Sequence, residues 1–319
     1  MTEPIVSTIT PCYRMERYLQ RFLDELPRQT IFDRTEVVLD LNAPSQDELG
    51  WVNSFIQRYP GRLKLVVTDP VQPIGTSMNT CIRNATGRYL TIWNVDDLRT
   101  PASLEAQVDA LIREPHAGIA FGDYQVVTTF GSQEGTLVRN RDLPPDEHNR
   151  GMTIGPFFMF KSELCERAGL FDEQLRSGAD FDLALRLLSH ASWAYAAQPL
   201  GYYLSAGLGA STRPDSLQWV EKNLIYMRYG IWDKLEIEAL PRLRAYHLNE
   251  LVIDGARVSV AQAFRNYEEV MRQRDMEWLP RLRAPLSARQ RFAPMVEKLT
   301  VSARNYRDAV RAVVRRMRS

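Results

Sequence analysis

The sequence predicts an α/β domain with a mostly parallel central sheet covered by helices on both faces, followed by a helical C-terminal region. Two observations support this fold class. Short apolar runs of strand length alternate with segments of helical periodicity over the first hundred residues. Beyond Asp215 the periodicity is helical almost to the end. We therefore expect one α/β domain at residues 1–215 and a helical region at residues 216–319 that serves oligomerisation or membrane association.

The predicted strands and helices follow one another in order. Ser45 and Glu48 form a capping-box pattern that should open one helix, and Thr100 with Pro101 should open another as N-cap and first helical residue. From Gly118 the pattern loosens into two shorter strands, 118–121 and 124–129, and a long polar stretch at 131–151, of the kind that is usually functional or disordered. The four clearest strands are residues 5–9, 36–39, 63–67 and 89–93.

Composition excludes several classes of protein. Lys and Arg number 40 against 39 Asp and Glu, so no global basic field indicates a nucleic-acid partner. The three cysteines, Cys12, Cys81 and Cys165, are far apart, which argues against a disulfide framework or a zinc site and is typical of a reducing compartment. The start of the chain lacks the pattern of a signal peptide, and no segment is apolar for long enough to span a bilayer. We expect a soluble, cytoplasmic protein.

Polar residues follow three of the predicted strands, where each strand ends. They come from residues 10–13, 40–42 and 94–97. In an open α/β sheet, ligands bind at the carboxyl ends of the strands, so these groups are candidates for one site. Any one acidic residue here, such as Asp40 or Asp97, also has a simpler interpretation as a cap of a turn or helix. Their coincidence at successive strand ends favours a site.

The end of the fourth strand carries the most specific pattern. Asp96 and Asp97 lie just before the predicted helix start at Thr100, and hard carboxylate oxygens suit Mg²⁺ or Mn²⁺, which bridge substrate phosphates. Gly75 and the small residues up to Asn79 come at another helix start, which can bind a phosphate or a sugar. Trp93, on the buried strand itself, is predicted to be core.

The order of these pieces resembles the family 2 glycosyltransferases of GT-A fold over about residues 4–230. Residues 6–13 are similar to the family's opening strand, and residues 75–79 with 85–89 to its Gly-x-x-x-Ala-Arg-Asn and Ala-x-Gly-x-Tyr run. Residues 94–97 fall on the Asp-x-Asp motif, and residues 155–161 resemble the acceptor-side segment. Residues 168–173 and 179–186 match Gly-x-Phe-Asp-Glu and Glu-Asp-x-x-Leu-x-x-Arg.

The resemblance implies an inverting glycosyltransferase of polysaccharide biosynthesis. It would move a sugar from a nucleotide-diphosphate donor to a hydroxyl of a glycan or lipid-linked acceptor, with Mn²⁺ or Mg²⁺ held by Asp96 and Asp180 as general base. Asp40 would hold the nucleobase, and Arg186 would pair with a carboxylate. Gly155, Phe157 and Asp182 would lie on the acceptor side, although Asp182 also has the interpretation of a helix-dipole partner. The implied donor-binding residues are Thr10, Pro11, Tyr13, Asp40, Asn42, Gly75, Asn79, Asn94 and Asp96.

Three departures from the family pattern stand out. Asn94 replaces the first carboxylate of the Asp-x-Asp motif. The second strand ends in residues 41–45, Leu-Asn-Ala-Pro-Ser, instead of Asp-Gly-Ser. Residues 201–212 contain no His of the kind that often completes the family's metal site, so we expect a metal that binds only with the nucleotide. Glycines around Leu208 suggest a loop that closes over the donor.

Alternative functions remain open from the sequence. A nucleotidyltransferase would normally need a basic, glycine-rich loop after the first strand, which residues 11–13 do not supply. A catalytically inactive glycan-binding or scaffold protein is favoured by Asn94 and by the missing His. Residues 301–319 carry six Arg against Asp308 alone, which fits an anionic membrane surface, a solvated helix or a homo-oligomer contact. The four histidines, His116, His148, His190 and His247, have no ligand spacing.

Overall fold

The structure is a computed structural model of the 319-residue chain. It describes residues 3–140, 145–148, 151–205, 217–229, 231 and 234, and the backbone of 250–253 and 256–259. The chain divides into two compact units, Met1–Arg213 and Pro214–Ser319. Each unit is described here by itself.

A seven-stranded sheet forms the centre of the first unit, in the order β10-β6-β9-β4-β1-β2-β3. Six of these strands run parallel, and β9 alone is antiparallel to both of its neighbours, β4 and β6. The predicted mixed α/β fold with a mostly parallel sheet is confirmed. The strands are β1 (Val6–Cys12), β2 (Thr35–Asn42), β3 (Leu63–Thr68), β4 (Tyr89–Ile92), β6 (Ala117–Gly122), β9 (Met159–Lys161) and β10 (Ser192–Ala196).

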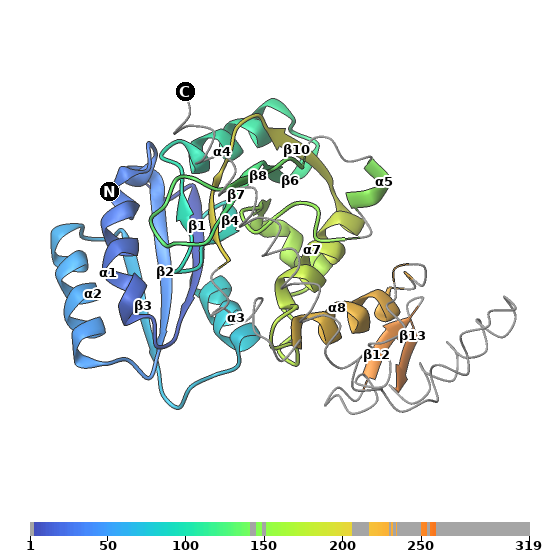
Figure 1. Cartoon of the computed structure of the whole chain (residues 1–319), viewed down its shortest axis with the longest axis horizontal. Coiled ribbons are helices and arrows are strands. Elements are labelled where there is room, and N and C mark those ends of the chain that lie inside the picture. The colour runs from blue at the N-terminus through green and yellow to red at the C-terminus, as the bar shows by residue number, and fades with distance from the viewer. Residues whose placement is uncertain are drawn as a thin grey trace, which may run out of the picture. The chain divides into compact units, whose positions relative to one another are not determined.

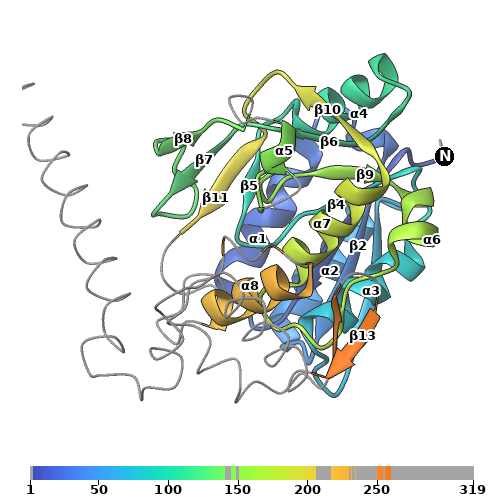
Figure 2. The ribbon, with the colours of Figure 1, turned by 90° about the vertical axis from the view of Figure 1, so that its right-hand side faces the viewer.

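Helices cover both faces of this sheet (Figures 1 and 2). On one face, α1 (Glu16–Glu25), α2 (Gln46–Arg58) and α4 (Ser103–Arg113) contribute to one apolar core with the strands, which includes the predicted core residue Trp93. On the other face lie α3 (Ile74–Asn84), which packs against β1 and β2, and α7 (Ala179–His190). The capping box predicted at Ser45 and Glu48 is present at the start of α2. Burial of both sheet faces explains why the strands contain runs of apolar residues rather than an alternation.

A second, four-stranded sheet has the order β5-β11-β7-β8. It is built from β5 (Leu98–Arg99), β7 (Tyr124–Val127), β8 (Thr136–Val138) and β11 (Gly201–Leu204). β5 directly follows the polar segment after β4, so this small sheet extends from the carboxyl end of the large one. The remaining short elements of this unit are η1 (Leu26–Arg28), η2 (Phe32–Arg34), η3 (Ser162–Leu164), α5 (Pro145–His148) and α6 (Cys165–Ala168).

Two predicted boundaries in the first unit are wrong. α4 begins at Ser103, because the chain first forms β5 and a turn, and the Thr100 hydroxyl donates to the Pro199 carbonyl (3.0 Å) instead of capping the helix. The first strand, predicted to end at Ile9, continues to Cys12, with Pro11 inside it. β4 pairs with β1 only as far as Ile9, so no partner on that side needs the N–H that proline lacks.

The described part of the second unit contains α8 (Leu217–Arg228) and an antiparallel pair, β12 (Glu250–Ile253) and β13 (Ala256–Ser259). The pair contradicts the prediction of a helical region. The local signal is Asp254-Gly255 in the sequence between two runs that contain Val and Ile, a typical hairpin pattern. The predicted loop at 206–212, His247 and the basic segment 301–319 lie outside the described residues. Within the described part of the chain, no helix is long and apolar enough to cross a membrane.

The amino end of the large sheet is held by a buried carboxylate. Glu36 Oε1 accepts hydrogen bonds from the Ser7 hydroxyl (2.5 Å) and from the backbone N–H (2.5 Å) and hydroxyl (2.9 Å) of Thr86. The Gly87 N–H donates to Ser7 Oγ (2.7 Å). A Cβ on Gly87 would lie 2.6 Å from Ser7 Oγ and 2.7 Å from the Ser7 backbone nitrogen. Glycine is therefore required for this close approach.

Replacing Gly87 with alanine should lower the free energy of unfolding by about 2–4 kcal/mol, because the new methyl group overpacks the β1 backbone and breaks a buried hydrogen-bond network. Urea denaturation measures the change. Gly50→Ala is the matched control, since no atom lies within 4 Å of a Cβ there and the site is an exposed position of α2. The control should gain up to about 1 kcal/mol. Equal effects of the two substitutions would contradict the prediction.

Candidate functional site

The carboxyl ends of β1, β2 and β4 meet at one edge of the sheet. Pro11 of β1 lies in register with Asp40 of β2. The pKa of the Cys12 thiol indicates that several negatively charged groups lie near this edge. Burial chiefly raises its pKa, and the carboxylates of Glu48, Glu16, Asp40 and Asp96 raise it further. Acidic groups from β2 and from the segment after β4 are thus both close to the end of β1.

Asp40 is wholly buried, and the chain itself uses its carboxylate. Oδ1 accepts from the Thr68 hydroxyl (2.6 Å), and Oδ2 accepts from the Ser77 hydroxyl (2.5 Å) and the Asn42 amide (3.0 Å). Asn42 Oδ1 in turn accepts from the Gln72 N–H (2.9 Å). This network ties β2 to β3 and α3. In this structure Asp40 and Asn42 are buried polar links, so the expected contact of Asp40 with a nucleobase has no exposed carboxylate to form it.

Asn79 and Gly75 on α3 also contact the protein itself. Asn79 Nδ2 donates to the Phe171 carbonyl (3.0 Å) and to Glu173 Oε1 (2.9 Å), and its Oδ1 accepts from the Phe171 N–H (2.8 Å). A Cβ on Gly75 would lie 2.8 Å from the Asp172 carbonyl oxygen. The small and polar residues at the start of α3 therefore form a docking face for residues 171–173.

The segment after β4 forms a tight turn with two carboxylates. Asp97 is buried; its Oδ1 accepts from the Leu204 N–H (3.0 Å) and its Oδ2 from the Asn94 amide (3.4 Å). Burial and then the neighbouring Asp96 charge raise the pKa of Asp97 to about 8. Asp96 is half-buried, burial raises its pKa, and among the described residues only its own backbone N–H donates to its carboxylate. Asp96 is therefore the carboxylate at this edge that is left for a ligand.

A buried arginine supports this turn from below. Arg99 Nη1 donates to Ser103 Oγ and Gln107 Oε1 (both 2.9 Å), and Nη2 donates to Thr91 Oγ1 (2.6 Å) and the Ile92 carbonyl (3.0 Å). The guanidinium also lies over the rings of Trp93 (5.5 Å) and Phe157 (5.2 Å). Burial lowers its pKa to about 9, which leaves it charged at neutral pH. Arg99 thus joins β4 to α4 next to the turn that carries Asp96 and Asp97.

The two acidic residues at the start of α7 differ sharply. Asp182 is wholly buried, and Oδ2 accepts from Arg186 Nε (2.9 Å) and Nη2 (2.8 Å). The predicted pairing of Arg186 with a carboxylate is confirmed. Asp182 has no accessible surface in this structure, and its placement on the acceptor side stays a prediction. Asp180 is half-buried, and its Oδ1 accepts from the Phe181 N–H (2.8 Å) at the helix N-terminus.

The expected acceptor-side residues Gly155 and Phe157 are buried too. Gly155 has a φ of 68°, and a Cβ there would lie 2.8 Å from the Tyr124 ring, so this glycine permits a turn against that ring. Phe157 packs edge-on against Tyr124 (6.1 Å). His148, in the polar stretch, is buried between Phe121 (4.9 Å) and Trp193 (5.0 Å). These residues shape the fold around the site.

The predicted site residues therefore fall into two groups. The buried group is held inside the protein and consists of Thr10, Pro11, Asp40, Asn42, Gly75, Asn79, Gly155, Phe157 and Asp182. The accessible group consists of Tyr13, Asn94, Asp96 and Asp180. Tyr13 is 39% exposed, with the Arg14 guanidinium 5.1 Å from its ring centre. Arg14 itself has a φ of 54°, a left-handed conformation that is uncommon away from glycine.

The carboxylate oxygens at Asp96 suit a hard divalent cation that a bound ligand would also coordinate. Its carboxylate and that of Asp97 belong to neighbouring residues; burial raises both pKa values, and the charge of Asp96 raises that of Asp97 further. A cation would offset that cost. Among the described residues no group of three His, Cys, Asp or Glu side chains is arranged to hold a metal ion. The protein by itself would thus supply few ligands, and the remainder would come from the ligand and water.

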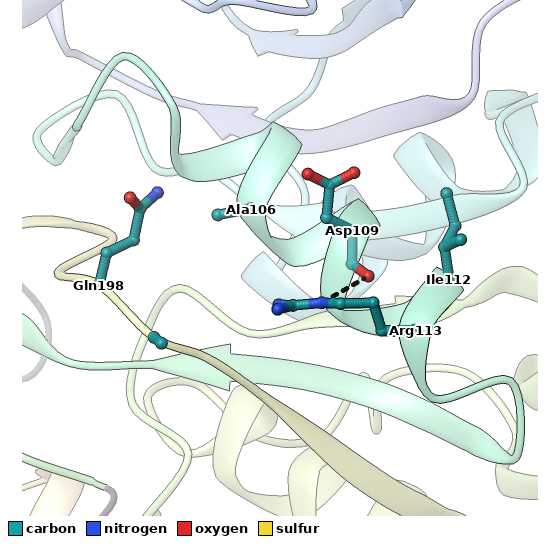
Figure 3. Close-up of a pocket in the computed structure, with 6 residues that line it drawn as sticks. Ala106, Asp109, Ile112, Arg113 and Gln198 are labelled. Carbon is teal, nitrogen blue, oxygen red and sulfur yellow. Dashed lines mark hydrogen bonds between the residues drawn. The ribbon is translucent and has the colours of Figure 1, made fainter.

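A separate hollow of about 350 Å³ lies on the outer side of α4 (Figure 3). Asp109, Ile112 and Arg113 line it from the helix, and Gln198 lines it from the turn after β10. None of the predicted site residues lines it. It is shallow and open to solvent, and it is distinct from the edge that carries Asp96.

Comparison with known families decides the classification. The family model described as Glycosyl transferase family 2 matches residues 7–169, just over half of the 319 residues. The chain belongs to glycosyl transferase family 2. The matched region contains β1 to β4, the Asp96 turn and β9, and it ends at Gly169, before Asp180.

Relatives with curated descriptions carry glycosyltransferase names. A putative glycosyltransferase, EpsE of Bacillus subtilis, is 31% identical over 126 residues, or 40% of this chain and 42% of that protein. An uncharacterised glycosyltransferase of Rickettsia felis is 25% identical over 193 residues, or 58% of this chain and 31% of that protein. The chondroitin synthase of Pasteurella multocida is 22% identical over 58% of this chain and 19% of its own. The match thus spans less than half of each of these relatives.

Solved structures establish the GT-A fold of the family 2 domain. TarS of S. aureus (residues 1–349), in complex with UDP-GlcNAc, superposes with a TM-score of 0.55 at 16% identity, covering 83% of this chain and 71% of that one. The mannosyltransferase PcManGT from Pyrobaculum calidifontis, in complex with GDP-Man and Mn²⁺, has a TM-score of 0.51 at 17% identity, covering 95% and 81%.

Sequence reasoning missed two residues of this family 2 domain that organise the site. The sequence did not reveal the role of Arg99, because a lone arginine after a strand is usually solvated. Its burial depends on Ser103, the first residue of α4, and on Gln107 one turn further along that helix. Glu173 was visible in the Gly-x-Phe-Asp-Glu match, but its partner Asn79 lies 94 residues earlier. No local pattern connects the two.

Asp97→Asn should flatten the pH dependence of stability. In the unfolded chain this carboxyl group ionises near pH 4, whereas the folded protein keeps the proton until about pH 8. The unfolded state therefore binds fewer protons across that window, and the free energy of unfolding falls as the pH rises. Urea denaturation between pH 5 and 8 with a chelator present should show a smaller fall for Asp97→Asn. Asp109→Asn, on the exposed face of α4, should keep the wild-type slope; equal slopes for Asp97→Asn and wild type would contradict the prediction.

Proposed function

We propose that this family 2 protein is an inverting glycosyltransferase that moves a sugar from a nucleotide-diphosphate donor to a hydroxyl of a glycan or lipid-linked acceptor. The observation that carries the proposal is Asp96. It is a half-buried carboxylate at the carboxyl edge of the sheet, and burial raises its pKa. It lies within the region matched to the family, where the sequence resembles the Asp-x-Asp motif. Perturbed carboxylates at such an edge are typical of functional sites.

The donor would bind at the edge formed by Tyr13, Asn94 and Asp96. These residues keep accessible surface, whereas the other expected donor contacts are buried. Tyr13 offers an exposed aromatic ring, and Arg14 beside it offers a positive charge for a diphosphate. A nucleotide-sugar donor is also supported by the titles of two structural neighbours, which name complexes with UDP-GlcNAc and with GDP-Man.

Asp96 would hold Mn²⁺ or Mg²⁺ together with the donor diphosphate. When bound, the cation neutralises the charge that develops on the departing diphosphate. A weakly preformed site agrees with the lack of a three-ligand cluster among the described residues. Asn94 adds no charge, so the amide serves as a neutral hydrogen-bonding group beside Asp96.

Asp180 would act as the general base. Its carboxylate accepts a hydrogen bond from the Phe181 N–H at the start of α7, where a carboxylate is favoured by the helix dipole. Asp180 would take the proton of the acceptor hydroxyl as that oxygen bonds to the anomeric carbon. The bond between this carbon and the diphosphate oxygen breaks on the opposite side, which inverts the configuration. The diphosphate leaves with the electron pair.

The other parts of the proposal concern the acceptor and the location. Gly155 and Phe157 would shape the acceptor side from beneath, since both are buried. Residues 216–319 would serve self-association or contact with a membrane through 301–319, at the cytoplasmic face where the donor is present. The shape of the pocket, rather than these motifs, determines which sugar, nucleobase, acceptor and linkage the protein uses.

One further candidate is an inactive glycan-binding protein of the same fold. Asn94 in place of a carboxylate, and the inward use of Asp40 and Asn42, favour it. The accessibility of both Asp96 and Asp180 favours the transferase. A nucleotidyltransferase gains no support from the described residues at the end of β1, where Tyr13 and Arg14 take the place of a glycine-rich loop.

Nucleotide binding is the first experiment. UDP, GDP, CMP and dTDP, each with and without Mn²⁺, should include one nucleotide that raises the melting temperature only when Mn²⁺ is present, because a ligand of the native state stabilises it by mass action. Asp96→Asn should lower the metal-dependent affinity by at least about 10–100-fold, the loss that is typical when only a partner of a metal ligand is removed. Asp109→Asn is the control. No shift with any nucleotide, in protein shown to be folded, would favour the binding protein.

Asp180→Asn separates catalysis from binding. The substrate is the sugar donor that contains the nucleotide identified by the thermal shift. The rate of sugar transfer, or of slow donor hydrolysis, should fall by about 10²–10⁴-fold, the usual contribution of a general base. The nucleotide affinity should stay within about twofold of wild type. Product release from the labelled donor measures the rate. Glu166→Gln, an exposed carboxylate on α6, should retain wild-type activity. An active Asp180→Asn protein would remove Asp180 as the base.

A further inference from the structure

α3 touches both halves of the proposed site. Its Ser77 hydroxyl donates to Asp40 Oδ2 (2.5 Å) and so joins the helix to the end of β2, where the donor edge lies. One half-turn further on, Asn79 makes three hydrogen bonds to Phe171 and Glu173, which belong to the segment leading to α7. The same rigid helix therefore contacts the donor edge and the chain that carries Asp180.

The contact between α3 and residues 171–173 is a clamp of several polar groups. Glu173 receives a hydrogen bond from Asn79 at Oε1 (2.9 Å) and from the Thr76 hydroxyl at Oε2 (3.0 Å). Arg83 lies 3.6 Å from Glu173 Oε1. These partners, Asn79 first, lower the pKa of Glu173 and keep it charged. Gly75 has no side chain, and this absence lets the Asp172 backbone approach the helix.

The same segment is also held from α7. The Arg186 guanidinium donates to the carbonyls of Ala168 and Leu170 (2.8 Å for Leu170) while it pairs with Asp182. Residues 168–173 are thus fixed between α3 on one side and α7 on the other (Figure 1). Only six residues separate Glu173 from Asp180, and Leu175 among them is wholly buried. The start of α7 has little freedom to move relative to α3.

We propose that Asn79 and Glu173 are positioning residues that set where Asp180 stands relative to the donor edge. The proposal rests on the role of Asp180 as general base given above. A base must come within hydrogen-bond reach of the acceptor hydroxyl, and a displacement of about 1 Å at a reacting group can cost about 10²-fold in rate. Asn79 and Glu173 act through Asp180 and need no contact with substrate.

The proposal predicts a specific pattern in a double-mutant cycle. Asn79→Asp replaces the amide donor with a carboxylate that faces the carboxylate of Glu173, so kcat should fall by about tenfold or more. Glu173→Gln alone keeps an acceptor for Asn79 and should change kcat by less than about threefold. In the double variant the Gln amide can donate to the new carboxylate, so much of the lost kcat should return. Restored activity on adding a second substitution is a coupling that independent sites do not show.

Three further measurements separate positioning from general damage. The affinity for the nucleotide found by thermal shift should stay within about twofold of wild type in all variants, because the donor edge is not altered. Hydrogen exchange of peptides covering residues 171–182 should quicken in Asn79→Asp and slow again in the double variant. Asn84→Asp is the matched control, since among the described residues the Asn84 side-chain amide donates only to the Thr80 carbonyl within α3 (2.9 Å).

The outcomes are distinct. Equal loss of kcat in Asn84→Asp, or parallel loss of kcat and nucleotide affinity, would overturn the positioning role. If Asn79→Asp does not fold, Glu173→Ala at the partly exposed end of the clamp takes its place and should lower kcat by about three- to tenfold with unchanged nucleotide affinity; unchanged kcat overturns the proposal. If the wild-type protein binds none of the four nucleotides and transfers no sugar from the corresponding donors, the proposed function fails. In that case unchanged hydrogen exchange at 171–182 in the variants overturns the clamp independently.

Discussion

The structure depends on how each buried carboxylate at the sheet edge is satisfied. An ionised carboxylate removed from water costs several kcal/mol unless hydrogen bonds or a counter-charge replace its hydration. Asp40 is wholly buried and accepts three hydrogen bonds from Thr68, Ser77 and Asn42. Asp182 is wholly buried and has the Arg186 guanidinium. Both therefore join elements of the scaffold. Asp96 has no comparable set of partners among the described residues, and the resulting cost is what a bound cation would offset.

This difference explains why so many polar residues at the edge are buried and hydrogen-bonded within the protein. The Asp40 network holds β2, β3 and α3 together, and Asn79 holds α3 against residues 171–173. Arg99 does the same between β4 and α4, directly beneath the Asp96 turn. Polar groups in a dry interior specify one arrangement because any other leaves them unpaired. The accessible groups, Tyr13, Asn94, Asp96 and Asp180, are thereby held in place by a larger set of buried ones.

What the sequence could predict follows from the range of each interaction. The strand–helix alternation and the capping box of Ser45 and Glu48 are local patterns, and both are present in the structure. The helix at Asp180 and the pairing of Arg186 with a carboxylate depend on neighbours within one turn. Burial of Asp40 depends on Thr68 and Ser77, which are 28 and 37 residues away, and that of Asn79 on residues more than 90 away. A strand-end motif cannot distinguish an acid that faces a ligand from one that faces another helix. The hairpin of β12 and β13 is different, since Asp254-Gly255 carried a local signal.

The same electrostatic constraint explains why an amide suits position 94 better than a carboxylate. Asp97 is buried beside Asp96, and the charge of Asp96 already raises its pKa. A carboxylate at position 94 would add a negative charge beside that of Asp96 and would raise the pKa of Asp97 further. The Asn94 amide instead lies 3.4 Å from Asp97 Oδ2, and this interaction lowers the pKa of Asp97 and opposes the effect of Asp96. Asp97 in turn accepts from the Leu204 N–H and so fixes β11 against the turn. Asn94 thus offers one carboxylate fewer than the Asp-x-Asp motif, but it adds no charge next to Asp97, the buried acid that holds the turn in shape.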